Sequence, residues 1–203
     1  MTQHQDALAW MRRNIGQREH PPGSNRGAFV QRCQAATWLG GTGWPWCVAA
    51  WVKAWMVAGR KLPYRGAGAY AMLDWYRKNL PGWLVPLEKA QPGAAVIFNI
   101  GSGHLGMLDK AYRFTKPSVA TVDGNVSDAL ERRVRDRSLV RGVVDPPRDI
   151  GTLKPVKPPL FEVVGSESGH KKIYVSTAGA VAKKLPAILK RHPLGVTIRR
   201  RKR

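Results

Sequence analysis

A cysteine at the start of a predicted buried helix is the residue in this sequence best placed for chemistry. Cys47 closely follows Pro45, a residue that suits the entry of a helix. Apolar residues then recur at helical spacing: Val48, Trp51, Val52 and Trp55. A thiol in the first turn lies at the positive end of the helix dipole, which favours the thiolate. The pattern predicts a nucleophile, with a small core residue as the alternative.

A thiolate nucleophile needs a base that takes and returns a proton, and histidine is the usual choice. His104 is our candidate because it opens a predicted strand, 104–108, directly after a glycine-rich turn. A side chain at that point can be held rigidly. The other histidines lie near the termini or in predicted loops and are expected to face solvent: His4, His20, His170 and His192.

A third polar group is needed to orient the imidazole. Asp109 lies five residues after His104, an odd offset that places it on the opposite face of an uninterrupted strand. Asp123 and Asn125 are two residues apart at the end of the next predicted strand, so they are expected to share a face. We predict that this pair orients His104. The alternative is that residues 123–125 form only a turn.

Helical patterns come first in the chain and strand patterns follow. Helices are predicted at 6–15, at 26–39, from Cys47 to a stop at Gly59, and at 67–79. Short apolar runs bounded by turn residues predict strands at 94–99, 104–108, 119–122 and near 139–144. This order predicts an α+β domain in which N-terminal helices pack on an antiparallel sheet.

A second, basic region follows a stiff linker. The domain above spans 1–150, a Pro- and Lys-rich linker spans 151–159, and the basic region spans 160–203. Its pattern predicts a small β-β-α-β unit, with strands at 160–164, 173–176 and 196–199 and a helix at 178–190. From Thr152 onward there are 13 Lys and Arg against 2 Glu, and the whole chain carries +21. Such a charge favours polyanionic partners.

Composition and motifs exclude several other classes of function. Two cysteines are too few for a disulfide scaffold, and no Cys or His cluster has the spacing of a zinc site. Cys33 is expected to pack inside its helix, with a Cys33–Cys47 disulfide as the alternative. There is no P-loop and no dinucleotide fingerprint. No run is apolar enough to cross a membrane, and no signal peptide is visible.

The order of three motifs resembles the CHAP family, the cysteine, histidine-dependent amidohydrolases/peptidases related to NlpC/P60 and papain-like enzymes. The motifs are 44–51 around the cysteine, 103–108 around the histidine, and 123–125. The stretches 15–25 and 124–128 also resemble CHAP-type lysins of phages that infect actinobacteria. The resemblance covers about residues 5–150 and implies a papain-like/CHAP fold.

The resemblance implies a peptidoglycan hydrolase, either an N-acetylmuramoyl-L-alanine amidase or a stem-peptide endopeptidase. Cys47 would attack the amide, and His104 would act as base and then as acid. Asp123, where relatives often have glutamate, would orient His104, and Asn125 would assist it or polarise the amide. Trp44 and Trp46 would line the groove, with core packing as the alternative for one of them. No metal or cofactor is expected, because 34–46 lacks the acidic residues through which some relatives bind calcium.

A different class of function stays open: a non-catalytic structural protein of a phage tail or virion that keeps the CHAP fold and attaches through its basic tail. For that tail, 160–203, the candidate partners are anionic wall polymers and phage tail proteins, with nucleic acid less favoured. The expected location is a phage virion or the host cell wall or periplasm. Because no signal peptide is visible, we expect synthesis in the host cytoplasm.

Overall fold

The computed structural model describes residues 2–148, and beyond them the backbone of 161–165, 173–175 and 196–200. The helices are α1 (Gln3–Arg13), α2 (Ala28–Gln34), α3 (Cys47–Val57) and α4 (Ala69–Asn79). Three short 3-10 turns are η1 (Pro81–Trp83), η2 (Leu87–Lys89) and η3 (Arg137–Leu139). The strands of the first sheet are β1 (Ala95–Phe98), β2 (His104–Leu108), β3 (Ser118–Val126), β4 (Ala129–Asp136) and β5 (Val140–Val144).

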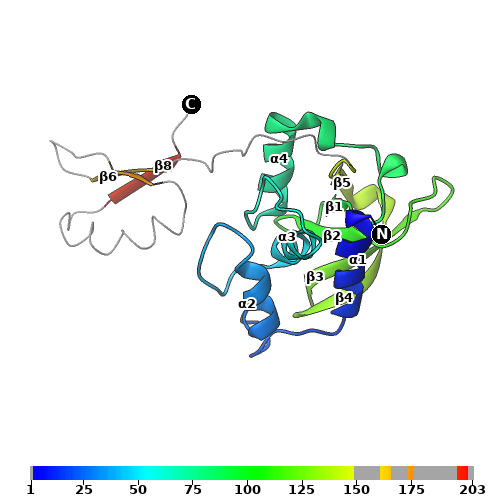
Figure 1. Ribbon diagram of the computed structural model, residues 1–203, viewed down its shortest axis with the longest axis horizontal. Coiled ribbons are helices and arrows are strands. Elements are labelled where there is room, and N and C mark those ends of the chain that lie inside the picture. Colours follow the sequence, from blue (N-terminus) through cyan, green and yellow to red (C-terminus); the bar gives the residue numbers. More distant parts are fainter. Residues whose placement is uncertain (1, 149–160, 166–172, 176–195, 201–203) are drawn as a thin grey trace. The chain divides into compact units, whose positions relative to one another are not determined.

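The five strands form one sheet in the order β4-β3-β2-β1-β5, and every neighbouring pair is antiparallel. Strands β1 and β2 form a hairpin in which Phe98 pairs with the predicted histidine, His104, the first residue of β2. Figure 1 shows helices in blue and cyan beside this sheet in green. The predicted α+β class, with helices and an antiparallel sheet, is confirmed.

Helix α3 is the buried centre of this domain. It contacts α1 and α2 as well as β2 and β3, while α4 packs against β1, β2 and β5. The apolar stripe predicted for α3 is fully buried, and its two tryptophans both donate their indole N–H to the Gly93 carbonyl oxygen. Ala49, Ala50 and Ala54 are buried too, because other elements enclose the helix on several sides.

The sheet is larger than the sequence pattern predicts. Strand β3 extends from Ser118 to Val126, so Asp123 lies inside the strand and not in a closing turn. Strand β4 was not predicted at all, because most residues at 131–136 are charged and no apolar alternation marks the strand. Charged side chains are common on an edge strand, where they discourage pairing with another chain. The turn between β3 and β4 falls at 127–128.

The first two helices also differ from their predicted bounds. Helix α1 begins three residues early because Thr2 and Gln5 form a capping box at its start. Helix α2 covers only part of the predicted 26–39. The prediction that His4 faces solvent is wrong: it is buried in α1, 2.7 Å from Asp145, and its ring meets Trp55 edge-on.

The chain divides into two compact units, one of Met1–Thr37 with Thr42–Thr152 and one of Trp38–Gly41 with Leu153–Arg203. In the second unit β6 (Phe161–Gly165) lies between β7 (Ile173–Val175) and β8 (Val196–Arg200), and both neighbours are antiparallel to it. These strands match the three predicted there to within a residue at each end. The predicted linker at 151–159 and helix at 178–190 lie outside the described residues. No helix in the described part of the chain is long and apolar enough to span a bilayer.

Candidate active site

Cys47 is the first residue of α3, as predicted. The helix has no side-chain cap at this end, and Trp46 supplies the N-cap position. The Cys47 amide lies among the first N–H groups of the helix, which have no intrahelical acceptor. Cys47 keeps 5% of its surface exposed. The thiol therefore lies at the positive end of a buried helix, in a residue that is almost fully enclosed.

His104 is the first residue of β2, at the end of the hairpin that leads from β1. Gly103 precedes it with a φ of +102°, and a Cβ there would lie 2.8 Å from the ring of Tyr70. Only glycine can adopt this positive φ without strain and also leave room for the Tyr70 ring. The turn is thus fixed, and the His104 side chain is 14% exposed.

Asp123 holds the histidine from the neighbouring strand. Its Oδ2 is 3.0 Å from Nε2 of His104, and its side chain has no exposed surface. Asp123 pairs with Gly106 across β2 and β3, and any side chain at Gly106 would collide with the Asp123 carboxylate. Because Asp123 occupies Nε2, the ring nitrogen left for the cysteine is Nδ1.

The protonation of His104 reflects both partners. Burial lowers the pKa of His104, but hydrogen bonds with Asp123 and Cys47 and the negative charge of both groups outweigh it and raise the pKa to about 9. The imidazole therefore interacts with both the Cys47 sulfur and the Asp123 carboxylate. The structure brings together Cys47, His104 and Asp123, which are distant in the sequence. Asp109 takes no part, since it binds Arg12 and Arg132.

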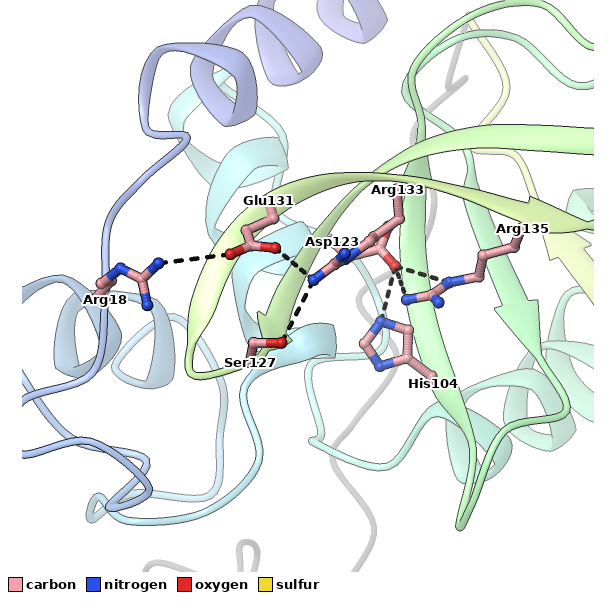
Figure 2. Close-up of polar contacts among 7 residues, drawn as sticks. All are labelled: Arg18, His104, Asp123, Ser127, Glu131, Arg133 and Arg135. Carbon is pink, nitrogen blue, oxygen red and sulfur yellow. Dashed lines mark hydrogen bonds and ion pairs between the residues drawn. The ribbon is translucent and has the colours of Figure 1, made fainter.

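Arg135 is a member of this cluster that the sequence did not predict. It comes from β4 and donates from Nη2 and Nε to Asp123 Oδ2, at 2.7 and 3.2 Å. Figure 2 shows the carboxylate between the His104 ring and the Arg135 guanidinium. The guanidinium lies over the ring of Phe98, 5.4 Å from its centroid. A fully buried carboxylate needs such compensation. Sequence periodicity gave no signal for β4, because five of the six residues at 131–136 are charged.

Asn125 is not joined to this cluster. The β3–β4 register shifts between Asp123 and Val126, and Asn125 has a φ of +62°. The regular alternation that predicted a shared face for Asp123 and Asn125 therefore stops between them. Among the described residues no hydrogen bond links the Asn125 side chain to His104 or Asp123. A role for Asn125 stays a prediction.

The two predicted groove tryptophans have different placements. Trp46 has no exposed surface, and its indole N–H donates to Glu19 at 2.8 Å. A Cβ at Gly124 would come within 2.9 Å of its ring, so the strand and the tryptophan pack directly together. The prediction that Trp46 contacts substrate is wrong, and the core-packing alternative holds for it. Trp44 is partly exposed, and its role stays a prediction.

Two polar side chains fix the loop that leads into α3. Buried Glu19 accepts the Trp46 indole on one oxygen and the Asn25 amide N–H on the other, at 2.8 and 2.6 Å. The Gln34 amide donates to the carbonyl oxygens of Asn25 and Trp44. The opening loop and the segment before Cys47 are therefore tied to each other.

Both cysteines are free thiols, so the disulfide alternative is absent. Cys33 is fully buried in α2, as predicted, and burial raises its pKa to about 12. A buried thiol of this kind is unreactive. Cys47 is the cysteine that contacts a histidine.

The described residues include no group of three or more His, Cys, Asp or Glu side chains arranged to hold a metal. Three surface cavities lie beside β5, beside the 110–120 segment and beside Asp109, and neither Cys47 nor His104 lines any of them. A comparison of the chain with protein-family models, curated proteins and solved structures found no match.

Proposed function

We propose that this protein is a cysteine-dependent peptidoglycan hydrolase of the CHAP type, which cleaves an amide bond of the bacterial cell wall. The observation that carries the proposal is the position of His104 between two partners: Asp123, 3.0 Å from its Nε2, and Cys47, whose hydrogen bond and charge help to raise its pKa. A thiol at a helix start, an imidazole and a buried carboxylate are the three parts that thiolate catalysis needs. The order of the sequence motifs adds the family and the substrate class.

In this mechanism the Cys47 sulfur attacks the carbonyl carbon of the amide, and His104 is the imidazolium that its raised pKa favours. The imidazolium gives its proton to the departing amine as the C–N bond breaks, which leaves a thioester on Cys47. Neutral His104 then takes a proton from water, and the resulting hydroxide displaces the sulfur and releases a carboxylic acid. Asp123 keeps the ring oriented in both steps.

The negative charge that develops on the carbonyl oxygen needs a donor nearby. The Cys47 backbone N–H has no acceptor in its own helix and lies beside the attacking sulfur. It is therefore the first member of the proposed oxyanion hole. The helix dipole of α3 adds favourable electrostatic potential at the same point.

A wall substrate also agrees with the charge of the chain. At +21, the protein is attracted to the anionic polymers of a bacterial wall. We propose that the basic tail, 160–203, binds these polymers or a phage tail protein, and that the enzyme acts as a phage lysin or virion-associated lysin. A salt titration of the full chain on purified wall and on DNA tests the first partner. Stronger retention on DNA than on wall would contradict it.

The test of the catalytic proposal is a zymogram of purified wall under reducing conditions. The wild type should clear the wall, Cys47→Ala should not, and the matched control Cys33→Ala should retain activity once its folding is checked by circular dichroism. Mass analysis of the released fragments then identifies the bond that is cleaved. Equal inactivity of the wild type and Cys47→Ala on walls of several chemotypes would refute the proposal.

A second candidate is a non-catalytic structural protein of a phage tail or virion that keeps this fold. The observation that favours it is the 5% exposure of Cys47, which leaves little surface for attack. Alkylation separates the two candidates. A catalytic Cys47 should react with iodoacetamide in the native state while Cys33 does not. Protection of both thiols would favour the structural role.

A further inference from the structure

A tyrosine and an arginine form a stacked pair beside the turn that precedes His104. Tyr70 lies in the first turn of α4, and its hydroxyl donates to the Asn99 side chain at 2.7 Å. Its ring also lies against Gly103, where a Cβ would come within 2.8 Å of it. The ring is therefore held from both ends of the β1–β2 turn.

The Arg141 guanidinium lies over this ring, 4.1 Å from its centroid. A guanidinium stacked on an aromatic face keeps its N–H groups at the edge, where they can meet another planar group. Arg141 is exposed, and in the part of the chain that the structure describes no carboxylate is paired with it. Arg135 and Arg137, its neighbours in sequence, are each paired with one.

The register places this pair at the same end of the sheet as the histidine. Phe98 of β1 pairs with His104 on one side and with Val140 on the other. Adjacent strands are about 4.8 Å apart, so His104 and Val140 are about 10 Å apart across the sheet. Arg141 directly follows Val140. An extended peptide covers that distance in about three residues.

We propose that Tyr70 and Arg141 form a substrate subsite that binds a free carboxylate of the wall peptide, about three residues from the amide that Cys47 attacks. The planar fork of arginine matches a carboxylate in two parallel hydrogen bonds, and the Tyr70 ring pre-orients that fork. This inference rests on the proposed hydrolase function and adds the part of the substrate that is recognised.

The surface beside Arg141 can accommodate the side chain of the residue that carries the carboxylate. Arg141 borders a cavity of about 440 Å³ beside β5, which Val85, Glu88 and Arg137 also line. The low exposure of Cys47 makes such a remote contact useful, because the reacting residues themselves offer little binding surface.

The test compares two synthetic stem tetrapeptides, one with a free C-terminal carboxylate and one with a carboxamide. The full-length wild type should hydrolyse the acid with a kcat/KM about tenfold above that of the amide, since a charge-assisted hydrogen bond is lost in the amide. Arg141→Gln should remove this preference by lowering kcat/KM for the acid alone, and Arg141→Lys should restore part of it. Arg113→Gln, at another exposed arginine beyond the other end of β2, should retain it.

Binding to the Cys47→Ala protein, measured by calorimetry with the same peptides, separates the subsite from catalysis. The acid should bind more tightly than the amide, and Arg141→Gln should abolish the difference. An unchanged preference in Arg141→Gln, in hydrolysis or in binding, would overturn the subsite. If the wild type binds the acid selectively but degrades neither peptide nor wall, the hydrolase proposal fails and the subsite stands.

Discussion

The described domain contains two buried histidine–aspartate pairs that look alike and have different surroundings. In one, His104 Nε2 is 3.0 Å from Asp123, and in the other, His4 Nε2 is 2.7 Å from Asp145. The first contacts Cys47 and keeps 14% of its histidine side chain exposed. The second is packed against Trp55, with 3% of its histidine side chain exposed.

The difference shows that such a pair becomes a candidate for catalysis only through its third neighbour and its access to solvent. The second Asp145 oxygen accepts the backbone N–H of Gln91, so this pair ties α1 to the segment before β1. These contacts make the His4–Asp145 pair a structural cross-link. Asp123 instead receives Arg135, a charged group that fixes the carboxylate while one nitrogen of His104 stays available.

Removal of the two histidines should separate these roles most strongly. His104→Ala should lower wall-degrading kcat/KM on the order of 10³-fold, because it removes the acid and base. His4→Ala should retain the specific activity of the folded protein but lower the free energy of unfolding by about 2–4 kcal/mol, because it leaves the buried Asp145 short of a partner. Zymography and urea unfolding measure the two quantities.

The comparison would fail if the effects were exchanged. A His104→Ala protein that clears wall as the wild type does would make its aspartate pair structural. A His4→Ala protein with normal stability but no activity would place the other pair in the catalytic machinery.

Arg135 provides the next largest effect. Arg135→Gln should lower kcat/KM on the order of 10²-fold with a smaller change in KM, because the Asp123 carboxylate loses the cation that positions it. Arg133→Gln is the matched control on the same strand, since Arg133 pairs with Glu131 and not with Asp123. Arg135→Lys should recover part of the activity. A pure loss of stability with unchanged kcat would contradict the positioning role.

The sequence was sufficient for the parts of the site that depend on local rules. Helix entry at Pro45 and the apolar stripe behind Cys47 predicted α3 correctly, and the glycine turn predicted the strand that His104 opens. The even spacing of Asp123 and Asn125 also selected Asp123, which lies opposite Gly106 inside β3 and not in a turn. These features are encoded within a few residues of each other.

The features that the sequence missed depend on long-range packing. Strand β4 is charged and carries no apolar alternation, so Arg135 could not be linked to Asp123 before the strand pairing was known. His4 was expected in solvent because it lies near a terminus, yet its partner is 141 residues away. Trp46 was predicted to line the groove, but its indole N–H donates to the buried Glu19 carboxylate and its side chain lies in the core.

Titration of His104 gives the finest test of the first pair. Its pKa of about 9 exceeds the ordinary 6.5, so the protonated form stabilises the fold fully below pH 6.5. That stabilisation is lost as the pH rises through about 9. The free energy of unfolding and kcat/KM should both decline on this alkaline side, where the imidazolium that protonates the leaving amine disappears.

In Cys47→Ala the pKa of His104 should move toward its ordinary value, because both the hydrogen bond and the negative charge of the cysteine are removed. The pKa should not fall all the way to its ordinary value, since Asp123 still binds Nε2. NMR titration of the His104 ring measures it, with Cys33→Ala as the control that should leave the midpoint near 9. Identical midpoints in the wild type and Cys47→Ala would mean that the sulfur and the imidazole do not interact. The two histidine–aspartate pairs would then no longer differ in chemistry, only in exposure.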